Sequence, residues 1–214
     1  MQYFLNSEGS VIIRNVITAI RLNKDYLTKV DGEIGDGDHG INMNKGFTMA
    51  AEQIDGSQSF SDAAKILSNV LMMEIGGSMG PLYGTLFKRF FKETKETEII
   101  TAEIFLRMLE SALNGVKEMG NAEVGDKTMI DTLSPAVTGF KDAVGKKLSF
   151  EDSLNKCIDS ARNGRDSTKE MIARIGRSSR LGERSRGVLD AGAVSCYIIL
   201  ESLTKSIIGI LKND

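Results

Sequence analysis

Apolar side chains recur every three or four residues along almost the whole chain, which is the spacing of an amphipathic helix. Alternation of apolar and polar residues over the length of a strand is hard to find. Eight such stripes begin at Ile13, Met43, Ile66, Leu82, Phe105, Met129, Leu154 and Ile199. The sequence therefore predicts an all-α fold of about eight amphipathic helices, with Thr101 and Ser149 suited to cap two of them.

Nothing in the sequence divides the 214 residues, because there is no internal repeat, low-complexity tract or proline-rich linker. We therefore expect one domain over residues 1–214. The net charge of −2, with 41% hydrophobic and 26% charged residues, is that of an ordinary globular protein and predicts no general binding to polyanions.

Cysteine and histidine are scarce, which excludes several kinds of site. Cys157, Cys196 and His39 are too few for a zinc site or a disulfide framework, and free thiols suit the reducing cytosol. No secretory signal is visible at the N-terminus. The longest apolar run, Val188 to Leu200, contains Asp190 and is shorter than the ~18 residues of a membrane helix. We expect a cytoplasmic protein without a membrane span.

The segment 31–42 is the most informative for function, with three aspartates and four glycines in twelve residues. Carboxylates on a glycine-rich loop are the hard oxygen ligands that Mg²⁺ takes together with substrate phosphates. Asp31, Asp36 and Asp38 are thus candidate metal ligands, and the helix expected to begin near His39 would point its N-terminal N–H groups at the same phosphates.

Other interpretations of segment 31–42 remain open at this point. A solvated turn that caps the next helix would have the same composition. Gly35, Gly37 and Gly40 match the dinucleotide-binding pattern G-x-G-x-x-G, but that pattern acts after a strand, and a helix is expected here. The glycine and ligand positions do not fit a calcium-binding EF-hand loop.

Two more glycine-rich loops precede expected helices. Segment 76–81 suits an anion at a helix N-terminus, and it also matches the hydrolase pattern G-x-S-x-G, which would need a strand before it and a late histidine. Segment 120–128 approaches the P-loop pattern, but Asp126 breaks it and no strand precedes it.

Basic residues gather in segment 162–186, which has eight basic and three acidic side chains and a local charge of +5. It lacks the aromatic residues that stack on bases, so no nucleic-acid partner is expected. Glycines around Arg177 would allow its guanidinium to approach phosphate oxygens closely.

Four motifs, taken together and in order, resemble the L subunit of the dihydroxyacetone kinase family. They are IGDGDHGINMN at 34–44, GGSMGPLYG at 76–84, GDKTM at 125–129 and GRSSRLGERS at 176–185. The similarity covers nearly the whole chain. It implies a barrel of eight antiparallel helices with a nucleotide, ADP or ATP, held by loops at one end through two Mg²⁺ ions.

The resemblance also implies roles for single residues. Asp31, Asp36 and Asp38 would be the metal ligands, and Asp36, Asp38 and Arg177 would be the catalytic residues. The nucleotide would be lined by His39, Gly40, Ile41, Asn42, Ser78, Met79, Gly120, Met129, Arg177, Asp190, Ala191 and Gly192. The family commonly has Ser in place of Met79 and Pro in place of Ala191, which removes one hydroxyl and loosens one turn.

In relatives with this layout, a separate K subunit holds dihydroxyacetone, and an M subunit of the phosphotransferase system rephosphorylates bound ADP through a histidine. We expect the same partners here, with a homodimer as a further possibility. Two alternatives stay open: an enzyme that uses exchangeable ATP, and a nucleotide-sensing module that regulates a partner protein without phosphoryl transfer.

Overall fold

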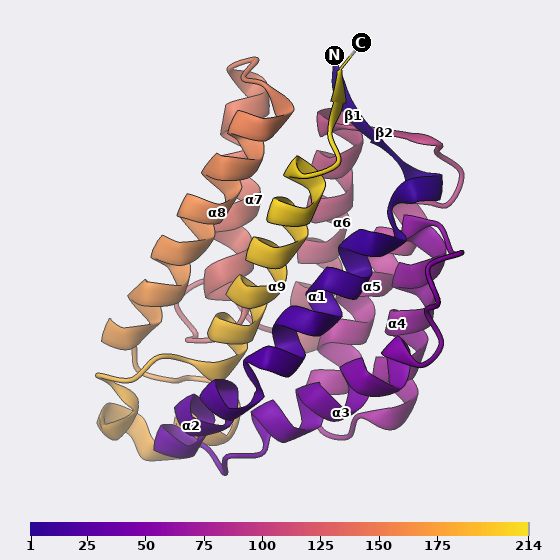
Figure 1. Ribbon diagram of the computed structural model, residues 1–214. Helices are drawn as coiled ribbons and strands as arrows, with labels where there is room; N and C mark the ends of the chain where they lie inside the picture. Colours follow the sequence, from indigo (N-terminus) through magenta and orange to yellow (C-terminus); the bar gives the residue numbers. More distant parts are fainter. Residues whose placement is uncertain (214) are drawn as a thin grey trace.

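The computed structural model describes residues 1–213 and is dominated by helices (Figure 1). Within these residues there are nine α-helices, three short 3-10 helices and three short strands. The α-helices are α1 (Ser10–Leu22), α2 (Lys24–Ile34), α3 (His39–Ala51), α4 (Phe60–Glu74), α5 (Met79–Thr94), α6 (Ala102–Gly120), α7 (Ile130–Gly145), α8 (Phe150–Ser167) and α9 (Ala191–Ile208). The 3-10 helices are η1 (Asn6–Glu8), η2 (Thr168–Glu170) and η3 (Arg177–Ser185).

Eight of the helices form a closed ring, in which each helix packs on the next from α3 to α9, α9 packs on α1, and α1 returns to α3. Short connections join most neighbours, as in an antiparallel bundle. The ninth helix, α2, contacts α3 and α9 near one end of the ring (Figure 1). The predicted all-α barrel is confirmed.

The ring is filled by side chains rather than open. Phe105, Phe140 and Phe150 form one aromatic cluster, with ring centroids 5.1 to 6.1 Å apart. Phe87 and Phe90 belong to a second cluster near α4 and α5, with their ring centroids 5.6 Å apart in an edge-to-face arrangement. Such contacts add to the free energy gained by burying the rings, so the interior is a packed core.

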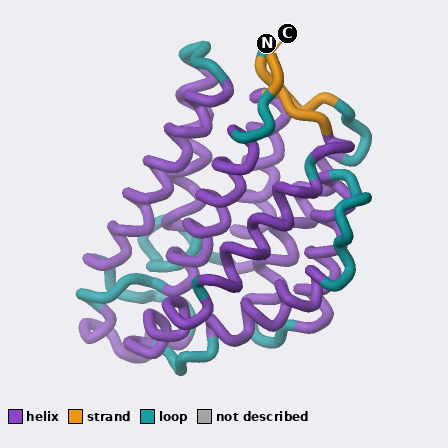
Figure 2. Tube along the Cα trace, viewed as in Figure 1, coloured by secondary structure: helices purple, strands orange, loops and turns teal. Residues whose placement is uncertain are grey.

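A small antiparallel sheet, which the sequence did not predict, lies at the end of the barrel where the two termini meet (Figure 2). Its strands are β1 (Gln2–Leu5), β2 (Ile99–Thr101) and β3 (Lys212–Asn213), in the order β2-β1-β3. Strands of four, three and two residues are too short to show an alternating pattern. Their pairing joins segments that are far apart in the sequence, so no local signal specifies it.

The structure differs from the predicted helices in where one stripe is divided and in how one helix is capped. The stripe from Ile13 to Leu27 is divided between α1 and α2 at Asn23. Ser149 caps α8 as predicted, because its hydroxyl accepts a hydrogen bond of 3.0 Å from the Asp152 amide. Thr101 does precede α6, but its hydroxyl donates to the Glu103 carboxylate instead of accepting from a backbone amide.

One helix of the described chain, α9, is long and apolar enough to cross a membrane by length and composition alone. The prediction that the apolar stretch is too short was wrong, since α9 runs for 18 residues. However, 67% of this stretch is buried inside the barrel, as expected for a core helix.

Candidate functional site

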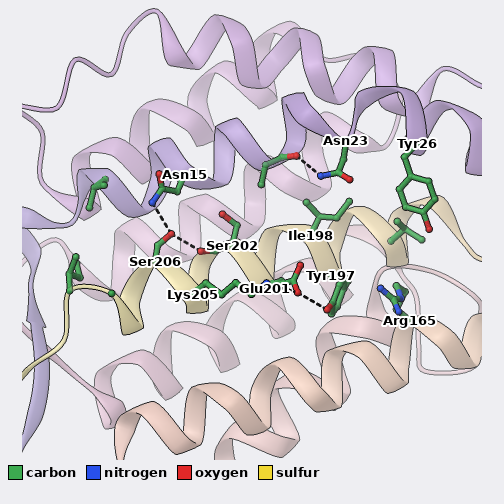
Figure 3. Close-up of a pocket in the computed structure, with 15 residues that line it drawn as sticks. Asn15, Asn23, Tyr26, Arg165, Tyr197, Ile198, Glu201, Ser202, Lys205 and Ser206 are labelled. Carbon is green, nitrogen blue, oxygen red and sulfur yellow. Dashed lines mark hydrogen bonds and ion pairs between the residues drawn. The ribbon is translucent and has the colours of Figure 1, made fainter.

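Two cavities of similar volume differ in chemistry. The first, about 740 Å³, is an open groove between α1 and α9 (Figure 3). Several of its polar side chains are paired with one another: Asn15 with Ser206 at 3.0 Å, and Glu201 with Lys205 at 2.9 Å. Tyr197 also donates to Glu201. These pairs leave no cluster of like charges that would require a ligand among the described residues of the groove.

The second cavity, about 750 Å³, is lined by residues of the loops that precede α3, α5, α7 and α9. The N-terminal ends of these helices lie at the end of the barrel opposite the termini (Figure 1). The cavity is lined by all four sequence motifs. Its polar lining residues are Asp31, Asp36, Asp38, His39, Asn42, Ser78, Lys127, Thr128, Arg177, Ser178 and Asp190. Its apolar lining residues are Met79, Pro81, Leu82, Val116, Met119, Ala122, Met129, Ile130 and Ile175. A pocket of this volume with both apolar and polar lining is typical of a small-molecule site.

The three predicted metal ligands come together. Each of Asp31, Asp36 and Asp38 offers a carboxylate oxygen, and these oxygens lie within 4.8 Å of one another. Asp31 is in the last turn of α2, whereas Asp36 and Asp38 are on the loop before α3. Three anionic groups this close repel one another unless a cation balances them, and an all-oxygen set suits Mg²⁺.

Glycines permit this arrangement where a side chain would not fit. A Cβ on Gly35 would collide with the Asp31 carboxylate, so a larger residue would displace a candidate ligand. A Cβ on Gly40 would collide with the backbone of Lys24 and Thr28 in α2. Gly40 therefore allows the N-terminus of α3 to lie directly against α2, beside the carboxylates.

We expect Gly40→Ala to destabilise the fold by about 1 to 3 kcal/mol, because its Cβ meets rigid backbone and the two helices must separate. Gly145→Ala is the matched control, since a Cβ there meets nothing within 4 Å and alanine favours helix. Urea denaturation of both variants measures the difference. Equal urea midpoints for Gly40→Ala and Gly145→Ala would contradict the close approach of α2 and α3.

Arg177 lies at the carboxylates, at the start of η3. Its guanidinium forms ion pairs with Asp36 and, at 3.7 Å, with Asp38. The Arg177 side chain is 61% exposed, so it reaches these carboxylates from the solvent side. The structure thus places the basic loop over the aspartate loop, although the two loops belong to distant parts of the sequence.

His39 begins α3 and is nearly buried. Its backbone amide donates to Asp31 at 3.3 Å, and its Nε2 lies 2.8 Å from the Ser195 hydroxyl. Ser195 in turn lies 2.6 Å from the hydroxyl of Tyr83. Burial lowers the pKa of His39 to about 4, against the opposing effect of Asp31. The imidazole is therefore neutral at pH 7 and belongs to a buried hydrogen-bond chain that links α3, α5 and α9.

Asp190 caps the N-terminus of α9, where its carboxylate accepts from the Ala193 amide at 2.7 Å. Burial raises the pKa of Asp190 to about 7, although the Ala193 hydrogen bond opposes the rise. The Tyr83 hydroxyl donates to the Gly192 carbonyl at 3.0 Å, which fixes the first turn of α9 against α5. Asp190, Ala191 and Gly192 thus form a rigid wall of the cavity.

The structure places most of the predicted nucleotide-lining residues in this cavity. Gly40 and Ile41 are not among its lining residues: Gly40 is buried against α2, and Ile41 is 52% exposed. Sequence reasoning did not assign Tyr83, Ser195 or Lys127 to the site. Tyr83 and Lys127 lie within the motifs at 76–84 and 125–129, and this position could have marked them as site residues. Ser195 lies outside the four motifs, so no sequence pattern pointed to it.

Known proteins with similar sequences belong to the same family that the four motifs resemble. The profile of the DAK2 domain matches residues 33–205. The ADP-binding subunit DhaL of the PEP-dependent dihydroxyacetone kinase of Escherichia coli is 39% identical, over 84% of this chain and 86% of that protein. The ADP-binding subunit DhaL of the PTS-dependent dihydroxyacetone kinase of Lactococcus lactis is 36% identical, over 86% of this chain and 88% of that protein.

The fold is similar to that of a solved dihydroxyacetone kinase from C. freundii, with a TM-score of 0.70 at 22% identity. The similarity covers 95% of this chain but only 35% of the solved one, so this chain spans about a third of that kinase. The same kinase has been solved in complex with AMP-PNP and Mg²⁺, where the TM-score is 0.69. On the DAK2 match, the identities and the shared fold, the chain belongs to the DAK2-domain family, the phosphotransferase family that includes the DhaL subunits of dihydroxyacetone kinases.

Proposed function

We propose that this chain is the nucleotide-binding subunit of a dihydroxyacetone kinase. In this proposal residues 1–214 form one nucleotide-binding domain, which acts in the cytoplasm and transfers a phosphoryl group from Mg²⁺-bound ATP to dihydroxyacetone on a separate K-type subunit. The names of the Escherichia coli and Lactococcus lactis relatives support this function, because both are ADP-binding subunits of such kinases.

The observation that carries the proposal is the juxtaposition of three carboxylates, a helix N-terminus and an arginine at one cavity. Asp31, Asp36 and Asp38 would hold the cation, and the N-terminus of α3 offers backbone N–H groups to an anion beside them. Arg177 is within reach of the same place. The apolar lining residues, among them Leu82 and Met119, suit the base of a nucleotide, because the flat faces of a base can be buried against apolar side chains.

The donor set fits Mg²⁺, because it consists of carboxylate oxygens without thiolate or imidazole ligands. An Mg²⁺ ion held by these carboxylates would supply positive charge to offset the negative charge of the phosphates. We propose two ions, since the three carboxylates and the phosphates of the nucleotide together carry more negative charge than one divalent ion and Arg177 balance. Arg177 would neutralise further charge as it develops during transfer.

We further propose that the nucleotide stays bound and is rephosphorylated by an M-type phosphohistidine subunit. The support is that the relatives named above are described as PEP-dependent and PTS-dependent. Mass analysis of nucleotide released from denatured, gel-filtered protein tests this: stoichiometric ADP is expected, and nucleotide-free protein would favour exchangeable ATP instead.

We expect the isolated chain with Mg–ATP and dihydroxyacetone to show no turnover, and activity to appear when a K-type subunit is added. The described residues place the candidate chemistry around one cavity, and transfer requires the acceptor oxygen to be held nearly in line with the phosphorus. A coupled assay with and without the K-type subunit measures this.

Two outcomes of this assay would contradict the proposal. Robust turnover by the chain alone would show that it holds its own acceptor site. Tight binding of Mg–ADP without transfer in the presence of any K-type subunit would instead indicate a nucleotide-sensing module.

A further inference from the structure

The turn before α7 is held in an unusual conformation by one buried carboxylate. Both oxygens of Asp131 are used, one accepting from the Gly125 amide at 2.6 Å and the other from the Thr128 amide at 2.7 Å. Within this turn Lys127 has a φ of 62°, a left-handed conformation that is uncommon for lysine. The clamp from Asp131 stabilises this conformation and fixes the start of the Lys127 side chain.

The Lys127 side chain is buried, with 1% of the residue exposed, although lysine is rarely so. Its ammonium donates to the carbonyls of Met171 at 3.2 Å, Val188 at 2.7 Å and Ser185. An ammonium has three protons and no acceptor, so these three carbonyls use its whole hydrogen-bonding capacity. In this arrangement Lys127 has no donor left for a phosphate, even though it borders the cavity.

The three carbonyls lie at the two ends of one segment, 171–188, which connects η2 to α9 and carries Arg177. Much of this segment is exposed between residues 174 and 187. Other contacts at its base are the hydrogen bonds from the Gly187 amide to the Lys169 carbonyl, at 2.7 Å, and from the Ala173 amide to Ser185 Oγ, at 2.9 Å. The Lys127 ammonium therefore connects the beginning of the segment, at Met171, to its end, at Ser185 and Val188.

We propose that Lys127 is a positioning residue, which closes the base of segment 171–188 and thereby holds Arg177 over the three-aspartate site. The catalytic part of this inference rests on the proposed function. Removing the ammonium leaves three carbonyls without their shared donor. The two ends of the segment are then held only by the weaker set of contacts that remains, such as the hydrogen bond from the Ala173 amide to Ser185 Oγ. Arg177 would still be present but would occupy its place for a smaller fraction of the time.

Hydrogen–deuterium exchange tests the anchoring without any assay of activity. Lys127→Met keeps an unbranched stem of the same four-atom length and removes the ammonium with its donors. We expect exchange of the amides of residues 171–188 to accelerate about 10-fold or more. The amides of α4 and α5 should not change. Lys146→Met, at an exposed lysine after α7, is the matched control. Unchanged protection of segment 171–188 in Lys127→Met would overturn the proposal.

Chemical rescue separates loss of the ammonium from damage to the turn. Lys127→Cys alkylated with 2-bromoethylamine restores a side chain that ends in an ammonium, and we expect it to restore protection. Cys157 and Cys196 are fully buried in the core, and burial raises both thiol pKa values, so they react slowly. Position 127 lines the cavity, and cysteine is smaller than the lysine it replaces, so the reagent can reach this thiol from the cavity. Alkylated wild-type protein is the control. Failure of the alkylated Lys127→Cys variant to restore protection would overturn the role of the charge.

A kinetic cycle tests whether Lys127 acts through Arg177. In the reconstituted kinase, Lys127→Met should lower kcat about 10-fold or more with little change in nucleotide affinity, and it should add little to the effect of Arg177→Met. Fully additive effects would overturn positioning through Arg177. If Lys127→Met does not fold by circular dichroism, Lys127→Gln replaces it in both experiments. A wild-type protein without transfer activity would refute the proposed function, yet the exchange result would still decide the anchoring.

Discussion

Asp36→Asn is expected to weaken Mg²⁺-dependent binding of ADP on the order of 100-fold, about 3 kcal/mol, while the helical fold remains intact. Asp36 is one of three carboxylates whose oxygens lie within 4.8 Å of one another. The neutral amide of an asparagine side chain is a much poorer ligand for a hard cation than a carboxylate is. The phosphates would then face Asp31 and Asp38 with less positive charge between them. Because the Asp36 side chain is 44% exposed, the substitution should cost little stability.

Isothermal titration calorimetry with ADP, in the presence and absence of Mg²⁺, measures the effect of Asp36→Asn. Asp142→Asn makes the same chemical change at an exposed position on α7 and should bind like the wild type. If Asp36→Asn binds ADP in the presence of Mg²⁺ as tightly as the wild type does, Asp36 is not a metal ligand. Such a result would favour the solvated turn that the sequence also allowed.

Arg177→Lys is expected to lower turnover about 100- to 1000-fold and to change nucleotide affinity only a few-fold. Lysine keeps the positive charge but loses the planar pair of donors that fits two phosphate oxygens at once. If Arg177 acts mainly on charge that develops during transfer, the loss appears in kcat rather than in binding. In the structure its guanidinium already lies at Asp36 and Asp38, where the phosphates are proposed to bind.

The measurement for Arg177→Lys is a comparison of kcat in the reconstituted kinase with the dissociation constant for Mg–ADP. Arg184→Lys provides a control in the same 3-10 helix, because Arg184 is exposed and lines neither cavity. Equal losses in turnover and in affinity would instead make Arg177 an ordinary binding residue.

Local sequence was sufficient for the helices and for the aspartate loop. The apolar stripes depend on neighbours three and four residues apart, so each helix can be recognised without knowing its partners. The same holds for Asp31, Asp36 and Asp38, which are close in sequence and converge because the chain reverses at a glycine-rich turn. Family resemblance then supplied the barrel and the order of the loops, which periodicity alone does not specify.

The division at Asn23 and the sheet at the termini were not predictable in this way. Asn23 carries no strong breaking signal, and the stripe continues in phase past it to Leu27. The strands β1, β2 and β3 are stabilised by pairing with one another across most of the chain length. Their stability is a property of the closed barrel, which brings both termini to the same end.

Apolar spacing was enough to locate most of the helices, and residue type was enough to show that a hard cation suits the loop at 31–42. The packing of the helices was needed to bring Arg177 to Asp36, to link His39 to Tyr83 through Ser195, and to bury Lys127 against three carbonyls. These contacts join residues that are far apart in the sequence, and they form because packing of the helices brings their loops to one end. Lys127 becomes an internal donor for the same reason: the fold surrounds its ammonium with three carbonyls of segment 171–188.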